Sequence, residues 1–159
     1  MNVVLFEPEI PQNTGNIVRT CAATGTRLHL IKPLGFELSD KYLKRAGLDY
    51  WADCDIKIYE NFDEFKTQNP GRYFYASTKS QKRYDAVKFE PSDYVIFGPE
   101  TRGLPEEMLH GSYDSCIRIP MIGSTRSLNL SNSVAIILYE ALRQQNFWGL
   151  NEIGHLTKY

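Results

Sequence analysis

Three segments of the 159-residue chain combine glycine with asparagine, serine, proline and a few charged side chains: residues 11–20, 97–105 and 117–133. Each segment follows a short apolar run that is typical of a buried strand, and open α/β sheets bind their ligands beyond the carboxyl ends of such strands. Glycine lets a ligand approach the backbone, while hydroxyl, amide and guanidinium groups can bind anions or orient hydroxyls. The three segments are therefore candidate ligand-binding loops.

The first segment, residues 11–20, places an arginine one helical turn after a glycine. Gly15 lies near the expected start of a helix, where exposed N–H groups favour an anion such as phosphate. Arg19 could grip a phosphate or orient a hydroxyl with its guanidinium. A helix capped by Asn13 or Thr14, with Arg19 as an ordinary surface residue, explains the same pattern. The spacing alone leaves both interpretations open.

The second segment, residues 97–105, carries Gly98 and Gly103 on either side of Glu100. Gly98 could let the backbone contact a flat ligand, and the Glu100 carboxylate could bond to ligand hydroxyls or stabilise the loop. The alternative is a plain strand-to-helix turn with glycines at positive φ. Because the segment lacks the GxGxxG pattern, a dinucleotide-binding fold is disfavoured.

The third segment, residues 117–133, is a long polar run that leads into an apolar helix. Polar loops of this length are more often functional than merely connecting. An N-cap role would explain Asn129 or Ser131 taken singly. It does not explain the whole run, so this segment is the strongest candidate of the three.

Composition narrows the function classes only slightly. The formal net charge is −1, which says nothing about nucleic acid because Lys and Arg can still gather on one face. The cysteines and histidines are scattered without metal-ligand spacing: Cys21, Cys54, Cys116, His29, His110 and His155. We therefore expect reduced thiols and no metal site. The apolar run 3–6 is too short for a signal or membrane segment, which predicts a soluble, cytoplasmic protein.

The hydrophobic pattern predicts an α/β fold with a mainly parallel sheet, formed by residues 1–159 as one domain. The predicted strands are residues 3–6, 28–31, 56–59, 73–76, 94–97 and 117–119. Helices are expected from Asn13 or Thr14 to Gly25, over 40–46 and 62–67, from Pro105, and from about Ser131. In the last helix Val134, Ile137, Leu138, Ala141 and Leu142 fall on one face.

The three segments, in this order and at this spacing, resemble the three signature motifs of the SPOUT (α/β-knot) RNA methyltransferases. Residues 5–16, with the sequence LFEPEIPQNTGN, and residues 47–50, with the sequence GLDY, resemble the branch that methylates the tRNA wobble nucleotide, cytidine or uridine, on its ribose 2′-oxygen. The resemblance covers nearly the whole chain, from Val3 to about Gly149.

This resemblance implies a parallel sheet flanked by helices with a C-terminal trefoil knot, a topology that general chain-path rules would not predict. It also implies S-adenosylmethionine as cofactor and in-line attack of a ribose 2′-hydroxyl on its methyl group. The cofactor site carried over from the family comprises Ala76, Gly98, Glu100, Ile119, Ser127, Leu128 and Asn129. Ser131 is expected to shape the same loop.

The resemblance assigns the catalytic role to Arg19, with Asn13 holding the substrate or the arginine. Since an arginine stays protonated, Arg19 would orient the hydroxyl and stabilise charge rather than act as a base. Lys44, Arg45 and, on weaker grounds, Tyr139 are expected to contact the anticodon region of tRNA; packing within the last helix is the alternative for Tyr139. Members of this branch work as homodimers, with sites near the interface.

Two basic groups could form a phosphate-binding track: Lys41, Lys44 and Arg45, and Lys79, Lys82 and Arg83. Ordinary solvated faces explain each group equally well. Three functional alternatives remain: a related SPOUT enzyme acting on another tRNA or rRNA ribose, a non-catalytic RNA-binding module on the same fold, and a nicotinamide-dependent oxidoreductase. Intact Arg19, Gly98 and Ser127 argue against the module, and the missing glycine pattern argues against the oxidoreductase.

Overall fold

The computed structural model describes residues 1–38 and 50–158. Six parallel strands form one sheet in the order β3-β2-β1-β5-β4-β6. The strands are β1 (Asn2–Phe6), β2 (Arg27–Ile31), β3 (Ile56–Tyr59), β4 (Tyr73–Ala76), β5 (Tyr94–Phe97) and β6 (Cys116–Ile117). The α-helices are α1 (Pro11–Thr24), α3 (Phe62–Gln68), α4 (Glu106–His110) and α5 (Leu130–Gln144), with short 3-10 turns η1 (Trp51–Asp53), η2 (Tyr84–Ala86) and η3 (Tyr113–Ser115).

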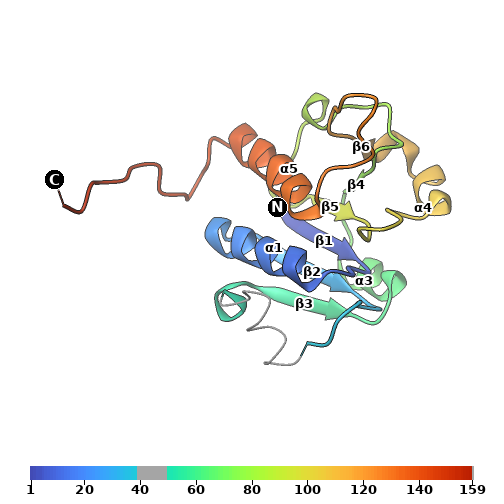
Figure 1. Ribbon diagram of the computed structural model, residues 1–159, viewed down its shortest axis with the longest axis horizontal. Helices are drawn as coiled ribbons and strands as arrows, with labels where there is room; N and C mark the ends of the chain where they lie inside the picture. The colour runs from blue at the N-terminus through green and yellow to red at the C-terminus, as the bar shows by residue number, and fades with distance from the viewer. Residues whose placement is uncertain (39–49, 159) are drawn as a thin grey trace.

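Helices cover both faces of the sheet, as Figure 1 shows. Alternate residues of a strand point to opposite faces, and in β1 Val3 and Leu5 pack with α1 and α5, whereas Val4 and Phe6 pack with α3 and α4. Burial on both faces explains why the strands read as continuous apolar runs. The predicted α/β fold with a parallel sheet is confirmed, and each predicted strand is present within one or two residues at its ends. The expected helix over 40–46 lies outside the described residues.

Helix α1 begins earlier than predicted. Pro11 opens the helix after Ile10, and no side chain caps its first turn. The prediction that Asn13 or Thr14 caps this helix is therefore wrong, because Asn13 lies inside the helix and directs its amide to other segments. The predicted stop is confirmed: Gly25 adopts φ 63°, a left-handed conformation that glycine reaches without strain.

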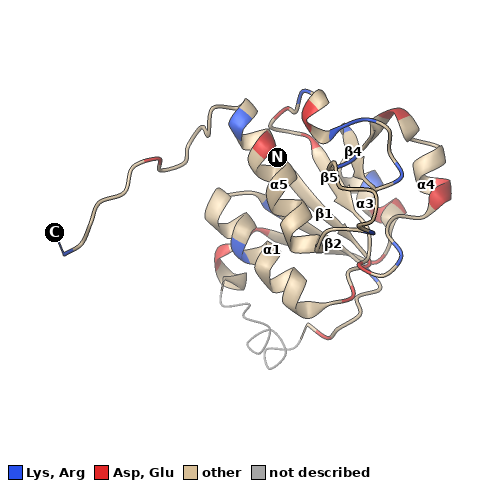
Figure 2. Ribbon diagram, turned by 45° about the horizontal axis from the view of Figure 1, so that its top comes forward, with Lys and Arg blue, Asp and Glu red and all other residues tan. Residues whose placement is uncertain are grey.

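Helix α5 buries the predicted apolar stripe: Val134, Ile137, Leu138, Ala141 and Leu142 are all in the core. Asn129 caps the helix by accepting hydrogen bonds from the backbone N–H groups of Ser131 and Asn132. α5 lies beside α1 on the same face of the sheet, and the two helices carry few charged residues (Figure 2).

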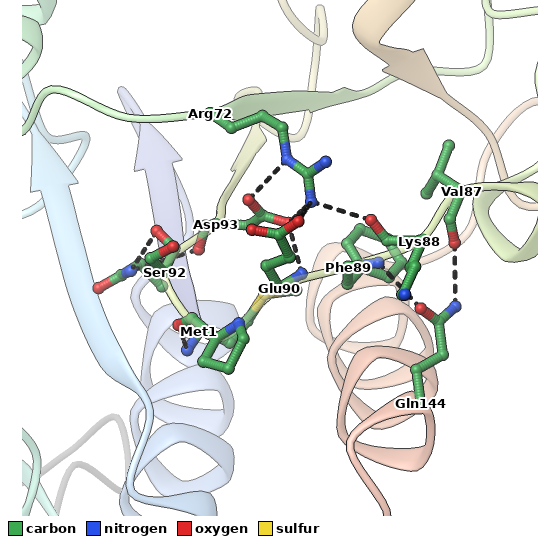
Figure 3. A network of polar contacts seen from close by, with 11 residues as sticks. Met1, Arg72, Val87, Lys88, Phe89, Glu90, Ser92, Asp93 and Gln144 are labelled. Carbon is green, nitrogen blue, oxygen red and sulfur yellow. Dashed lines mark hydrogen bonds and ion pairs between the residues drawn. The ribbon is translucent and has the colours of Figure 1, made fainter.

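The amino ends of the strands are joined by a closed polar network (Figure 3). Asp93, with a side chain only 1% exposed, accepts two hydrogen bonds from the Arg72 guanidinium, at 2.8 and 2.6 Å. Gln144 of α5 ties the helix to the same region through the N–H of Phe89 and the carbonyl of Val87. Because Arg72 satisfies both of its oxygens, the Asp93 carboxylate can be buried while the arginine stays partly exposed.

Asn2 links this network to a buried histidine of β2, because its Nδ2 donates to the Asp93 carbonyl at 3.3 Å and its Oδ1 lies 3.4 Å from His29 Nε2. His29 Nδ1 lies 2.9 Å from the Tyr59 hydroxyl, and Tyr59 in turn bonds to Asn69. The ring of His29 stacks on Tyr59 and meets Phe65 edge-on. Burial, with the nearby Arg27 and Lys57 charges, lowers the pKa of His29 to about 4. His29 is therefore neutral in the folded protein near neutral pH.

Candidate active site

A cleft of about 310 Å³ lies at the carboxyl ends of β4, β5 and β6. All three glycine- and asparagine-rich segments contribute to it, which is the arrangement that their position after parallel strands predicts. Its walls combine apolar side chains, such as Phe97, Ile117 and Ile137, with polar groups from Asn13, Glu100 and Asn129. A volume of this size with few polar groups is typical of a small-molecule site.

Glu100 fastens the second segment to the first. Its carboxylate accepts hydrogen bonds from the backbone N–H groups of Glu9 at 2.9 Å and Ile10 at 3.2 Å. It also accepts one from Asn13 Nδ2, at 3.0 Å. The first turn of α1 lacks a side-chain cap, and this carboxylate instead holds the chain where it enters the helix. Of the two sequence-based interpretations of Glu100, the structure shows the loop-stabilising one.

Asn13 links the third segment to the other two. Its Oδ1 accepts a hydrogen bond of 2.9 Å from Asn129 Nδ2, while its Nδ2 donates to Glu100. Asn129 uses its own Oδ1 to cap α5. A continuous chain of side-chain bonds, from Glu100 through Asn13 to Asn129, therefore joins the three segments around the cleft.

Gly98 is required by the loop that it opens. A Cβ atom at this position would lie 2.3 Å from the Leu104 nitrogen and 2.4 Å from the Gly103 carbonyl carbon, distances that real Cβ atoms do not show. The loop of the second segment thus folds back on its own strand end, and the backbone at Gly98 still lines the cleft. Close approach of backbone to backbone, which the residue spacing did not reveal, explains this glycine.

The structure brings together all seven residues expected at the cofactor: Ala76, Gly98, Glu100, Ile119, Ser127, Leu128 and Asn129. Asn13 lies with them. The sequence analysis assigned no individual ligand-binding role to several further lining residues: Ile10, Ser77, Thr78, Met121, Ser133 and Ile137. Ser77 and Thr78 follow β4 directly, so the same strand-end rule that identified the other loops would have indicated them.

Arg19 lies apart from the cleft lining. It is exposed on α1, about 9 Å further along the helix axis than Asn13 and about 120° around it. Its guanidinium stacks over the ring of Tyr50, 5.0 Å from the ring centroid. Tyr139 is likewise exposed on α5 and outside the lining. Lys44 and Arg45 lie outside the described residues.

Within residues 1–38 and 50–158, no cluster of three His, Cys, Asp or Glu side chains is placed to hold a metal ion. The three cysteines are free thiols. None of the helices described is long and apolar enough to cross a membrane.

Comparison with known proteins gives one family for the chain. The model of the SpoU rRNA Methylase family matches residues 1–139. A tRNA (cytidine(34)-2′-O)-methyltransferase of Saccharophagus degradans is 55% identical over 150 residues, which are 93% of this chain and 97% of that protein.

Solved structures agree with this match. A structure from work on the 2-OH methylation of C/U34 on tRNA superimposes with a TM-score of 0.86 at 47% identity, covering 92% of this chain and 96% of that one. An AdoMet-bound rRNA methyltransferase of Sinorhizobium meliloti superimposes with a TM-score of 0.75 at 27% identity, covering 89% of this chain and 55% of that one.

Proposed function

This chain belongs to the SpoU rRNA methylase family, and from that membership we propose that it transfers a methyl group from S-adenosylmethionine to a ribose 2′-oxygen of tRNA. The nucleotide is the wobble position of the anticodon, cytidine or a modified uridine. Support for this position comes from the Saccharophagus degradans relative, named for cytidine 34, and from the solved structure concerned with C/U34.

One observation carries the proposal: the bonded chain Glu100–Asn13–Asn129 gathers three segments from distant parts of the sequence around a single cleft. Side chains fixed in this way hold their polar groups at set positions before a ligand arrives. Pre-positioning is the main contribution that a protein can make when the transferred group is already activated.

The cleft fits S-adenosylmethionine. Its volume of about 310 Å³ lies in the range of small-molecule sites. Apolar walls at Ile117, Ile119 and Leu128 suit a flat, largely apolar ring, and the backbone groups of Ala76 and Gly98 are available for hydrogen bonds. Glu100, Ser127 and Asn129 add polar side-chain atoms to the lining. When bound, the cofactor supplies a methyl group on a positively charged sulfur.

Asn13 and Arg19 are the residues we assign to the ribose. A ribose hydroxyl is a poor nucleophile near neutral pH, so a group that orients it and stabilises developing charge is required. Arg19 provides a fixed positive charge, and Asn13 provides an amide inside the cleft. We assign Lys44, Arg45 and Tyr139 to contacts with the anticodon region. Arg19 and Tyr139 are exposed in one copy of the chain, so both are available to RNA bound beside a dimer interface formed by α1 and α5.

The proposal includes a homodimer, a C-terminal trefoil knot and action in the cytoplasm. The family resemblance supports the knot and the dimer. The face formed by α1 and α5 also supports a dimer, since it carries few charges (Figure 2). In one copy of the chain Ala135 and Ile136 of α5 are only partly buried, and Tyr139 is exposed. Light scattering after size exclusion should therefore give twice the mass of the chain.

Transfer of tritiated methyl groups from S-adenosylmethionine to unmodified tRNA, followed by nucleoside mapping, tests the function. Label at ribose 34 is expected. Label at a different ribose would place the protein in a neighbouring branch of the family, and no transfer to any tRNA or rRNA would reject the enzyme.

The Arg19 assignment has its own test. Arg19→Ala should abolish transfer while calorimetry still shows cofactor binding, because the side chain lies outside the cleft lining. Gln12→Ala, another exposed position on α1, is the matched control. If Arg19→Ala also loses cofactor binding, the assigned role is wrong.

A further inference from the structure

Five basic side chains lie in two segments at the β6 end of the sheet, the loop that follows β4 and the segment that leaves β6, although the whole chain has a net charge of −1. We call them the β6-edge cluster: Lys79, Lys82, Arg83, Arg118 and Arg126. Figure 2 shows lysine and arginine along the loops beside β4, the strand that pairs with β6. Such a local excess of positive charge is the usual footprint of a polyanion-binding surface.

Backbone hydrogen bonds hold the cluster in place. The Lys82 carbonyl accepts a bond of 2.9 Å from Arg118 N–H, and the Arg118 carbonyl accepts one of 2.9 Å from Tyr84 N–H. Ser80, only 3% exposed, donates from its hydroxyl to the Cys116 carbonyl at 2.7 Å. The loop that follows β4 is thereby fixed to the end of β6, so the basic side chains start from an ordered backbone.

The same arrangement brings like charges together. Arg83 and Arg118 are partners in a parallel β-bridge, and like charges that face each other across strands are destabilising. Asp85 balances Arg83, and Glu106 balances Lys79. Arg118 and Arg126 take part in no ion pair between residues that the structure describes. Arg118, paired with Arg83 beside β6, and Arg126, in the segment that leaves β6, therefore remain without a counter-charge among the residues that the structure describes.

The cluster borders the cleft directly along the chain. Arg118 lies between Ile117 and Ile119, both of which line the cleft, and Arg126 precedes Ser127, which also lines it. Because neighbouring residues of an extended segment point to opposite sides, Arg118 points away from the cleft that its neighbours face. A chain that entered the cleft over the end of β6 would pass Arg118 on the outer side of that segment and Arg126 in the loop that supplies Ser127 to the cleft.

We infer that the β6-edge cluster, through Arg118 and Arg126 above all, binds the phosphodiester backbone of RNA beside the ribose that enters the cleft. This inference rests on the proposed function for its ligand, RNA. Arginine suits the role because its planar guanidinium bonds to phosphate oxygens in pairs. Such contacts position the RNA without reading its sequence.

The test compares Arg118→Gln/Arg126→Gln with wild type in binding to unmodified tRNA at a series of KCl concentrations, by fluorescence anisotropy. Each lost phosphate contact should lower the slope of log K against log salt by about 0.7–0.9. Tenfold weaker binding for each contact is the expected order of magnitude, or about 100-fold for the pair. Cofactor affinity by calorimetry should stay unchanged, since neither side chain lines the cleft.

Lys57→Gln/Lys66→Gln is the matched control, because it removes the same charge at exposed positions on β3 and α3, at the opposite edge of the sheet. It should bind tRNA within about twofold of wild type. Equal losses in both double variants, or an unchanged salt slope in the arginine variant, would overturn the inference. The outcome for the proposed function is distinguishable from this one. A wild-type protein that binds tRNA but transfers no methyl group would contradict the proposed function, whereas its salt slope, compared with that of the arginine variant, would still test the phosphate contacts.

Discussion

The two ends of the sheet use polar side chains for different purposes. At the amino ends of the strands, Arg72 and Asp93 form a closed pair between neighbouring segments (Figure 3), and neither residue lines the cleft described above. At the carboxyl ends, the bonds of Glu100, Asn13 and Asn129 run between loops and surround a cleft of about 310 Å³. The first network should stabilise the fold, whereas the second should position a ligand.

The largest loss of stability is expected from Gly98→Ala, at the carboxyl ends of the strands. The new methyl group would overlap the backbone of Gly103 and Leu104, which cannot move aside as a side-chain end could. We expect a loss of about 3 kcal/mol or more in the free energy of unfolding. Because the displaced loop lines the cleft, cofactor affinity should fall at least about tenfold. Urea unfolding and calorimetry measure the two quantities.

Gly123→Ala is the control for that substitution. Gly123 lies in the third segment, has no atom within 4 Å of its ideal Cβ position and does not need a positive φ. It should unfold and bind like wild type. Normal cofactor binding by Gly98→Ala would show that the conformation of the loop at residues 97–105 does not determine cofactor binding in the cleft.

Arg72→Ala tests whether the polar network at the amino ends of the strands stabilises the fold. It leaves the buried Asp93 carboxylate without its partner, at a cost of about 2–4 kcal/mol, reduced from the fully buried case because Arg72 is itself 46% exposed. The kcat of methyl transfer, corrected for folded protein, should stay within about twofold of wild type. Lys32→Ala breaks an exposed ion pair to Glu60 and should cost less than about 1 kcal/mol. A large drop in kcat for Arg72→Ala would mean that the network at the amino ends of the strands also serves catalysis.

Sequence patterns predicted the helices and strands better than the hydrogen bonds that join them at the two ends of the sheet. The strands and the buried stripe of α5 follow from apolar periodicity, which is a local property of the chain. The start of α1 was predicted wrongly because the cap residue expected there, Asn13, bonds to Glu100 and Asn129, far away in the sequence. Local propensity cannot register a partner 87 or 116 residues distant in the sequence.

The candidate site shows the same division. The strand-end rule placed three segments at the carboxyl ends of the strands, and the seven cofactor residues chosen by the family resemblance all line one cleft. The reason for Gly98 could not be predicted, because the atoms that exclude a side chain there belong to a turn known only from the fold. The separation of Arg19 from Asn13 follows from helix geometry, but the side of α1 that meets the cleft depends on the fold.

A third prediction concerns how the stability contributed by His29, which adjoins the network at the amino ends of the strands, depends on pH. The pKa of His29 is about 4 in the folded protein and about 6.5 when unfolded, so the unfolded chain binds a proton more readily between these values. The stability that neutral His29 provides is thus complete above pH 6.5 and lost as the pH falls toward 4. At pH 5 the loss is about 2 kcal/mol. Urea unfolding at pH 7.5 and pH 5 should show this drop in wild type.

His29→Gln isolates the contribution of this side chain, since glutamine does not titrate. Its stability should depend on pH less steeply than that of wild type, while His110→Gln, at an exposed position on α4, should keep the wild-type slope. Equal slopes for wild type and His29→Gln would mean that His29 is not held neutral by the fold.

The smallest change in stability, with a clear change in activity, is expected from Glu100→Gln. The carboxylate accepts three hydrogen bonds, and an amide in its place presents an N–H group to one of those donors. One lost bond should cost about 1 kcal/mol of stability. The misplaced Asn13 and third segment should reduce kcat/KM about tenfold or more while tRNA affinity is kept. Glu107→Gln on the exposed side of α4 should change neither quantity. If Glu100→Gln loses as much stability as Arg72→Ala and keeps its kcat/KM, the networks at both ends of the strands only stabilise the fold.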